Sequence, residues 1–107
     1  MRYSESQPDE KGCVTLKVDG SLTHKTAPDF IPVRDNLALR LERGEIRGVI
    51  IDCGALLQID TVGVEILFHL YRRSKACGGS VSLANVNGQA RSLLRLLHLD
   101  KAEGFLL

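Results

Sequence analysis

The sequence predicts a single small α/β domain: a mostly parallel, mixed sheet of four or five strands, packed with three or four helices. Short β-branched and apolar runs alternate along the chain with longer segments in which apolar residues recur at helical spacing. The chain has 107 residues, close to the commonest domain size, so one core spanning 1–107 is expected. No repeat or low-complexity segment interrupts the pattern.

The N-terminal part predicts two strands. Val14, Leu16 and Val18 alternate with polar residues, and this period of two indicates a strand with one buried face. The preceding residues, 8–12, are rich in turn formers. Residues 2–6 are therefore expected to fold back as an antiparallel edge strand.

A first helix follows, but its start is ambiguous. Apolar residues recur at helical spacing between positions 30 and 41, and Gly44 supplies a C-terminal stop. Thr26 and Pro28 are typical of a helix N-terminus, whereas Pro32 inside a helix would remove a donor and clash. Regular helix is therefore expected only from about Pro32.

The middle of the chain predicts a central strand, a linker and a helix. The β-branched run 49–51, which ends at Asp52, is typical of a strand covered on both faces. Residues 53–60 are expected to form a linker. A helix is predicted over about 61–76, ended by Gly78 and its neighbouring glycine.

The C-terminal part predicts a strand over 80–86 and a third helix. Asn87 is a suitable N-cap for that helix. Its apolar residues follow the i, i+3, i+4, i+7 pattern and are Ala90, Leu93, Leu94 and Leu97.

Composition excludes several classes of function. The apolar fraction is 44%, the charged fraction 25% and the formal charge +1, so no nucleic-acid or membrane-surface partner is implied. No apolar run approaches the roughly 18 residues that a membrane span needs, and the polar first ten residues contain no signal-peptide core. A cytoplasmic protein without direct membrane insertion is expected.

The sequence also lacks the patterns of an enzyme, a metal site or a cofactor site. It contains neither GxGxxG nor GxxxxGK[ST]. The three histidines form no i, i+4 pair and have no nearby cysteine, so no metal is expected. The widely spaced Cys13, Cys53 and Cys77 indicate reduced, mostly buried thiols, and a catalytic role for Cys53 is disfavoured.

Residues 59–63 lie where the strand and linker turn into the second predicted helix, at the sheet edge where α/β domains usually place their sites. One interpretation is structural: Asp60 or Thr61 caps the helix. The other is regulatory, because the free N–H groups and dipole at a helix N-terminus can hold a phosphate added to a hydroxyl. Such a phosphate would block a docked partner without unfolding the domain.

The apolar arc of this helix is wider than one packed face requires. Val64, Phe68 and Tyr71 extend it toward solvent on a helical projection. This arc indicates either a docking surface that begins beside Thr61 or additional packing against a neighbouring helix.

Together, these residues resemble the STAS domain, the fold of bacterial anti-sigma-factor antagonists. The similar motifs cover nearly the whole chain: Gly20 and Leu22 as Gly-x-Leu, the strand that ends at Asp52, Asp60 to Gly63 as Asp-Ser/Thr-x-Gly, and the Gly-Gly that closes the basic helix end. The leucine-rich residues 86–99 also resemble the family's last strand and helix.

The resemblance implies that Thr61 is phosphorylated by an anti-sigma kinase and dephosphorylated by a phosphatase of the PP2C type. The unphosphorylated protein would bind the kinase and free a sigma factor. Asp60 would shape the site and Gly63 would permit close approach. The residues expected to bind the partner are Asp60, Thr61, Val62, Gly63, Val64, Glu65, Phe68 and Tyr71.

Two positions depart from the family pattern. Val62 stands where the family often has a second Ser, and Glu65 stands where it often has a second Gly, so the docking helix carries a charge. The Asp-Thr-x-Gly version also resembles the STAS subunit of bacterial lipid-transport ABC systems. In that alternative the domain would steady an ATPase and Thr61 would be a contact without a phosphate cycle.

Overall fold

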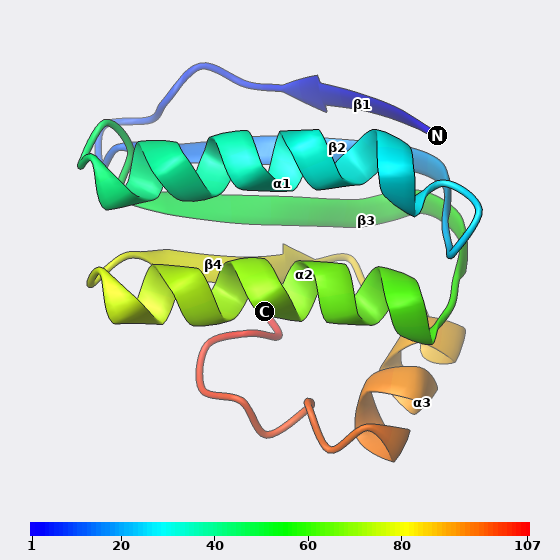
Figure 1. Ribbon diagram of the computed structural model, residues 1–107. Coiled ribbons are helices and arrows are strands. Elements are labelled where there is room, and N and C mark those ends of the chain that lie inside the picture. Colours follow the sequence, from blue (N-terminus) through cyan, green and yellow to red (C-terminus); the bar gives the residue numbers. More distant parts are fainter.

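Four strands form one mixed sheet in the order β1, β2, β3, β4 in this computed structural model, which describes residues 1–107 (Figure 1). They are β1 (Arg2–Glu5), β2 (Cys13–Leu22), β3 (Gly48–Ile59) and β4 (Ser80–Ala84). The first pair is antiparallel and the other two pairs are parallel. The predicted mixed, mostly parallel sheet with an antiparallel N-terminal edge strand is confirmed.

Three helices pack with this sheet: α1 (Ala27–Glu42), α2 (Thr61–Ala76) and α3 (Gly88–Leu96). The long helices α1 and α2 lie side by side across one face, and α3 lies beyond the end of β4, next to the start of α2 (Figure 1). None of the helices has the length and apolar character that crossing a membrane requires.

The expectation that regular helix begins only near Pro32 is wrong, because α1 begins at Ala27. Pro28 occupies the first turn, where a missing N–H costs nothing. Pro32 removes the hydrogen bond to the Pro28 carbonyl, but both prolines are exposed, so water can reach that carbonyl. Phe30, which is fully buried, anchors the turn between them.

The expected linker at 53–60 is also wrong, since β3 continues to Ile59 by pairing with the second half of β2. Two register shifts interrupt this pairing, and at each of them β3 contributes one residue more than β2. These are β-bulges, which bend a strand and are frequent beside functional sites. Because the bulges break the strict alternation of apolar and polar residues, the sequence pattern did not predict a strand here.

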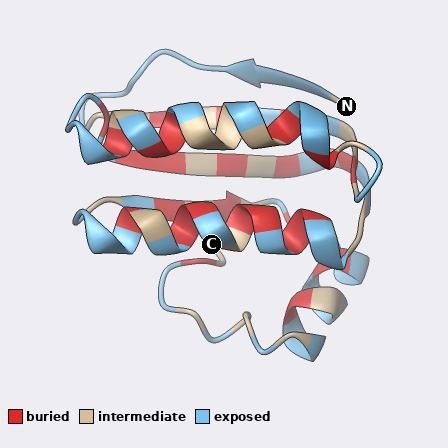
Figure 2. Ribbon diagram, in the orientation of Figure 1, coloured by how far each residue is buried: buried red, intermediate tan, exposed pale blue.

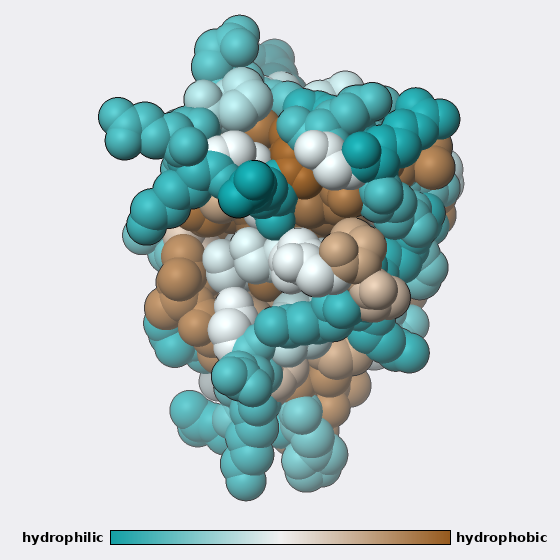
Figure 3. All heavy atoms as spheres, turned by 90° about the vertical axis from the view of Figure 1, so that its left-hand side faces the viewer, coloured by the Kyte–Doolittle hydropathy of each residue, from teal (hydrophilic) through white to brown (hydrophobic).

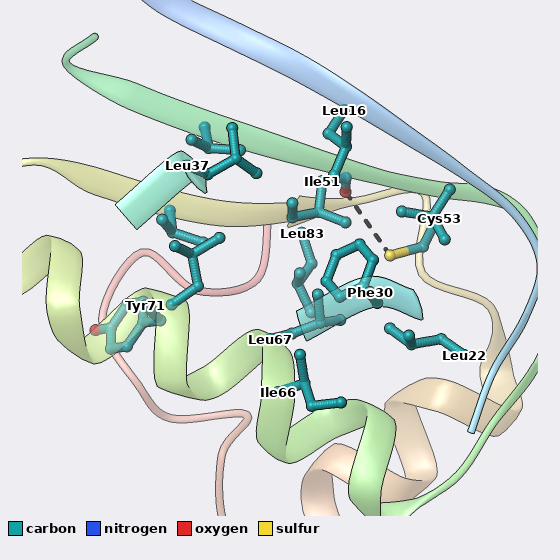
Figure 4. Close-up of a cluster of buried hydrophobic side chains, with 14 of the residues drawn as sticks. Leu16, Leu22, Phe30, Leu37, Ile51, Cys53, Ile66, Leu67, Tyr71 and Leu83 are labelled. Atoms are coloured by element: carbon teal, nitrogen blue, oxygen red, sulfur yellow. Dashed lines mark hydrogen bonds between the residues drawn. The ribbon is translucent and has the colours of Figure 1, made fainter. Parts of the chain in front are cut away.

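The core lies between the sheet and the two long helices, where apolar side chains of β2, β3 and β4 meet Phe30, Leu37, Ile66 and Leu67 (Figures 2 and 4). Val49 and Ile51 point into it. Ile50 is only half-buried, on the opposite face of the strand. The expectation of a central strand covered on both faces is therefore wrong for this residue.

The C-terminal residues extend the sheet, which the sequence did not predict. The Leu83 N–H donates to the Phe105 carbonyl at 2.7 Å, and the Leu107 N–H donates to the Leu83 carbonyl at 3.0 Å. These bonds form a short parallel bridge beside β4. Phe105 is 0% exposed and packs its ring against Phe68 and Tyr71.

Only one of the three cysteines meets the expectation of buried thiols. Cys53 is buried and its Sγ lies 3.7 Å from the Ile51 carbonyl oxygen (Figure 4), whereas Cys13 is half-buried and Cys77 is exposed. Cys77 follows the last residue of α2, so its side chain lies outside the helix packing.

Candidate functional site

The candidate site lies at the carboxyl ends of the parallel strands, on the right of Figure 1. There β2 ends at Leu22, β3 ends at Ile59, and α2 begins at Thr61. Ser21 and Leu22 pair with Gln58 and Ile59, so the loop after β2 lies next to the start of α2. This is the edge where parallel α/β sheets usually place their sites.

Asp60, and not Thr61, caps α2. Its backbone is extended and its Oδ1 accepts the Gly63 N–H at 2.9 Å, while its carbonyl accepts the Val64 N–H at 3.0 Å. The side-chain bond satisfies one of the donors that a helix N-terminus leaves free, and the Val64 N–H makes the first intrahelical bond. Thr61 is therefore the first helical residue, and its side chain is exposed.

A second interaction ties this cap to the loop after β2. Both the backbone N–H and the Nδ1 of His24 lie 2.9 Å from Asp60 Oδ2. Partial burial would raise the pKa of Asp60, but the hydrogen bonds from the His24 and Gly63 N–H groups and from the His24 ring outweigh it and lower that pKa to about 2. The carboxylate therefore stays ionised at physiological pH.

Gly63 lets α2 approach the end of β2. A Cβ on Gly63 would lie 2.2 Å from the Leu22 carbonyl oxygen and 3.0 Å from the Ile59 side chain. No larger residue fits without moving the backbone. The close approach that the motif implied is thus one between two parts of this chain, and Gly63 is buried.

Two exposed apolar side chains lie close to Thr61 in the sequence. Leu57 is 75% exposed, and Val62 is 37% exposed. Leu57 lies within the second bulge of β3, between two residues that pair with β2. A bulge residue leaves the alternation of the strand, which explains why a large apolar side chain points to solvent.

The predicted apolar arc is mostly covered. Val64 and Tyr71 are buried, so the expectation that they extend toward solvent is wrong. The C-terminal segment covers Tyr71, whose hydroxyl donates to the Glu103 carbonyl at 2.6 Å. Additional packing thus accounts for Tyr71, although against a C-terminal segment rather than a helix, and Val64 belongs to the buried core cluster.

Phe68 and Glu65 remain accessible on the same side of α2. Glu65 is exposed and Phe68 is half-buried, and together with Arg72, Leu97 and Leu99 they line a shallow hollow of about 170 Å³. The Arg72 guanidinium lies 5.0 Å from the centre of the Phe68 ring, a cation–π distance. The accessible part of the predicted site is therefore Asp60, Thr61, Val62, Glu65 and Phe68.

Asp52, which ended the predicted strand, has a structural role. Its Oδ1 accepts the Asn85 side-chain amide at 3.0 Å and the Gly54 N–H at 2.9 Å, and these bonds lower the pKa of Asp52. Asn85 has a φ of 58°, and the bond that its amide donates to Asp52 steadies this left-handed residue in the turn after β4.

The larger hollows elsewhere contain none of the predicted site residues. The largest, about 470 Å³, lies on the outer face of α3. At the opposite end of the molecule (Figure 3), hydrophilic side chains surround pale and brown surface, and a hollow of about 280 Å³ there is rich in glycine. No group of three or more His, Cys, Asp or Glu side chains is placed to hold a metal ion.

Sequence reasoning missed two residues of the site. His24 precedes Asp60 by 36 residues and carries no local signal of the contact. Leu57 fell in the expected linker, where an apolar residue attracts no attention. A strand pattern that allowed bulges would have drawn attention to Leu57.

Known proteins share this architecture. The sequence matches the STAS domain family over residues 7–105. The chain therefore belongs to the STAS domain family. No curated protein matches the sequence at a significant level.

Three solved structures illustrate the shared fold. The anti-sigma factor antagonist SpoIIAA of Bacillus, in its unphosphorylated form, is 16% identical with a TM-score of 0.74, and the alignment covers 99% of this chain and 87% of that chain. An anti-sigma factor antagonist from Mycobacterium paratuberculosis is 24% identical with a TM-score of 0.72, covering 98% and 85%. The protein SLC26A9 is 15% identical with a TM-score of 0.71, covering 91% of this chain but 18% of that chain.

Proposed function

We propose that this protein is an anti-sigma-factor antagonist that acts by binding and not by catalysis. In its unphosphorylated form it would bind an anti-sigma kinase and free a sigma factor. The kinase would transfer the γ-phosphoryl group of ATP to Thr61 Oγ, with loss of the hydroxyl proton and release of ADP, and this would end the binding. A phosphatase of the PP2C type would restore the antagonist. These partners would place the protein in the cytoplasm.

The observation that carries this proposal is the exposed Thr61 side chain in the first position of α2, directly after a capping carboxylate. A kinase can reach this hydroxyl without unfolding the helix. A phosphate there adds about −1.5 to −2 charges and a hydration shell, which a docked protein would have to strip. The similarity in fold to SpoIIAA, solved in both unphosphorylated and phosphorylated forms, supports the same assignment.

The proposed docking surface comprises Leu57, Thr61, Val62, Glu65 and Phe68. Its apolar members can supply the desolvated centre that protein interfaces need, and Glu65 lies among them as a charge. Three buried residues would support this surface indirectly, because they fix α2 against β2 and the C-terminal segment: Gly63, Val64 and Tyr71. Asp60 would hold the first turn in place.

The test uses Thr61→Asp and Thr61→Ala with an anti-sigma kinase encoded near the gene. Thr61→Asp should abolish capture of the kinase in a pull-down while circular dichroism shows an unchanged fold. Thr61→Ala should still bind and should accept no phosphate from radiolabelled ATP. Ser92→Asp, on the exposed face of α3, is the matched control and should bind like the wild type. Unchanged binding by Thr61→Asp would refute the switch.

A second candidate is a constitutive STAS subunit of a bacterial lipid-transport ABC ATPase. The similarity to SLC26A9 favours it, because that protein belongs to a transporter family in which STAS domains also occur. In this case Thr61 would be an unmodified contact. The protein would then co-purify with a transport ATPase, and no phosphorylated form would be found by mass spectrometry of the cellular protein.

A further inference from the structure

His24 lies beside the proposed phosphorylation site with one ring nitrogen engaged and the other free. Its Nδ1 is 2.9 Å from Asp60 Oδ2, and an ionised carboxylate can only accept, so Nδ1 carries a proton. Nε2 has no partner in the protein, and 66% of the side chain is exposed. The imidazole therefore presents its second ring nitrogen to solvent while it is held against Asp60, the residue that precedes Thr61.

Phosphorylation of Thr61 would leave an excess of negative charge around it. Asp60 precedes it, and Glu65 lies four residues later, on the same side of the helix. A phosphoryl group would add about −1.5 to −2 charges to this pair of carboxylates. The cationic side chains on the adjoining loop are those of His24, when protonated, and Lys25. Only His24 is held in place, by its bond to Asp60.

We propose that His24 is the charge partner of a phosphoryl group on Thr61, and thus a positioning residue of the switch. The inference rests on the proposed function, since it requires phosphorylation at this hydroxyl. The cationic form of the imidazole carries a proton on both ring nitrogens. Held by Asp60 through Nδ1–H, this cation offsets the repulsion between the phosphate and the two carboxylates. The first turn of α2 thereby remains folded in both states.

Two hydrogen bonds allow the effect of the His24 side chain to be measured separately from that of the α2 cap. The Gly63 N–H and the backbone N–H of residue 24 both donate to Asp60, and neither depends on the imidazole. His24→Gln should therefore leave α2 capped and remove only the titratable ring. His24→Lys keeps a cation at this position, so it tests whether charge is the property that matters.

The experiment is a double-mutant cycle between residue 24 and the phosphate. Phosphothreonine is installed at position 61 during translation by an expanded genetic code, so no kinase is required. Urea unfolding is measured for threonine and phosphothreonine proteins that carry His, Gln or Lys at position 24, at about pH 6, where imidazoles can be protonated. Lys25→Gln is the matched control.

Phosphorylation should raise the unfolding equilibrium constant at least about threefold more in the His24→Gln protein than in the wild type, as expected for a partly exposed ion pair. His24→Lys should restore the wild-type response, and Lys25→Gln should behave like the wild type. In addition, the ³¹P resonance of the phosphothreonine should titrate at higher pH in the His24→Gln protein. Equal effects of phosphorylation in all backgrounds, with an unchanged ³¹P titration, would overturn the proposal.

The outcome is independent of any partner. If the cycle shows coupling but the phosphorylated protein still binds its kinase, the proposed function fails while the role of His24 stands. If phosphorylation releases the kinase and the cycle is additive, the function stands and the role of His24 fails.

Discussion

The Leu22 carbonyl oxygen lies where a Cβ on Gly63 would meet it at 2.2 Å. This contact joins the end of β2 to the first turn of α2. It fixes the position of the first turn of α2, which contains Thr61, relative to the end of β2. The first turn of α2 therefore depends on this close backbone approach as well as on the Asp60 cap.

Gly63→Ala should destabilise the domain by about 1–3 kcal/mol, the usual cost of forcing extra atoms into a packed site. The first turn of α2 must shift away from Leu22 to make room. Urea unfolding monitored by circular dichroism measures the loss. Gly88→Ala is the control: Gly88 begins α3 and has open space around its Cβ direction, so that variant should be as stable as the wild type or slightly more so.

Asp60 should make stability depend on pH in the acid range. Its hydrogen bonds outweigh partial burial and lower the pKa to about 2, from an ordinary value near 4. The contribution is therefore present above about pH 4 and lost as pH falls toward 2, because the unfolded state then binds the proton more readily. Asp60→Ala should cost about 1 kcal/mol at neutral pH, as other lost N-caps do.

Urea midpoints measured between about pH 2 and pH 7 check this expectation. The Asp60→Ala curve should fall less steeply than the wild-type curve in acid. Parallel curves would mean that the carboxylate gains nothing from its three donors. Asp29→Ala, an exposed carboxyl in the first turn of α1, provides a comparison without such donors.

Cys53 should resist thiol reagents in the folded protein. Burial, with a further effect of the nearby Asp52 charge, raises the pKa of Cys53 to about 12, so almost no thiolate exists at about pH 8. A disulfide reagent such as Ellman's should modify the exposed Cys77 quickly and Cys53 only after denaturant is added. Cys77→Ser should remove the fast phase. A fast phase that survives in this variant and is lost with Cys53→Ala would contradict the buried assignment.

The C-terminal segment should be held by its aromatic anchor. Phe105→Ala should cost about 3–5 kcal/mol, because it empties a fully buried site. Tyr71→Phe, which removes only the bond to the Glu103 carbonyl, should cost about 1 kcal/mol. Hydrogen exchange at the amides of Leu83 and Leu107 reports the attachment. Tyr3→Phe, on the exposed edge strand, should change neither quantity.

Leu57 should matter for binding and not for stability. Leu57 and Leu96 are both 75% exposed, so Leu57→Ser and Leu96→Ser should each leave the urea midpoint nearly unchanged. Leu57 lies near the end of β3, four residues before Thr61, whereas Leu96 lies at the end of α3. Titration calorimetry with the proposed kinase partner should show about tenfold weaker binding for Leu57→Ser and wild-type binding for Leu96→Ser. Equal losses in both variants would place the interface elsewhere.

Local patterns predicted the elements whose signals lie within a few residues. Helix α2 was predicted to its observed bounds, since its cap, its apolar period and its two closing glycines are all adjacent in sequence. Asn87 was likewise predicted as the cap of α3, and its Oδ1 accepts the Ala90 N–H at 2.9 Å. These features depend on local chemistry, which a single sequence displays.

The features that the sequence did not predict all depend on tertiary contacts. The bulged half of β3 is a strand only because β2 lies beside it, and α1 passes through Pro32 because the freed carbonyl faces water. Tyr71 is covered by residues more than 30 positions away. His24 reaches Asp60 across a similar distance. Pairings of this kind leave no trace in local periodicity.

The late burial of Phe105 also affects the chain during its synthesis on the ribosome. Chains emerge from the ribosome N-terminus first, so β1 through α2 are available well before residue 105. Until that ring arrives, the neighbouring aromatic side chains of α2 and the outer edge of β4 stay uncovered. A nascent chain stalled just short of this residue would expose apolar surface that chaperones can bind. Release of a few more residues would be enough to bury it.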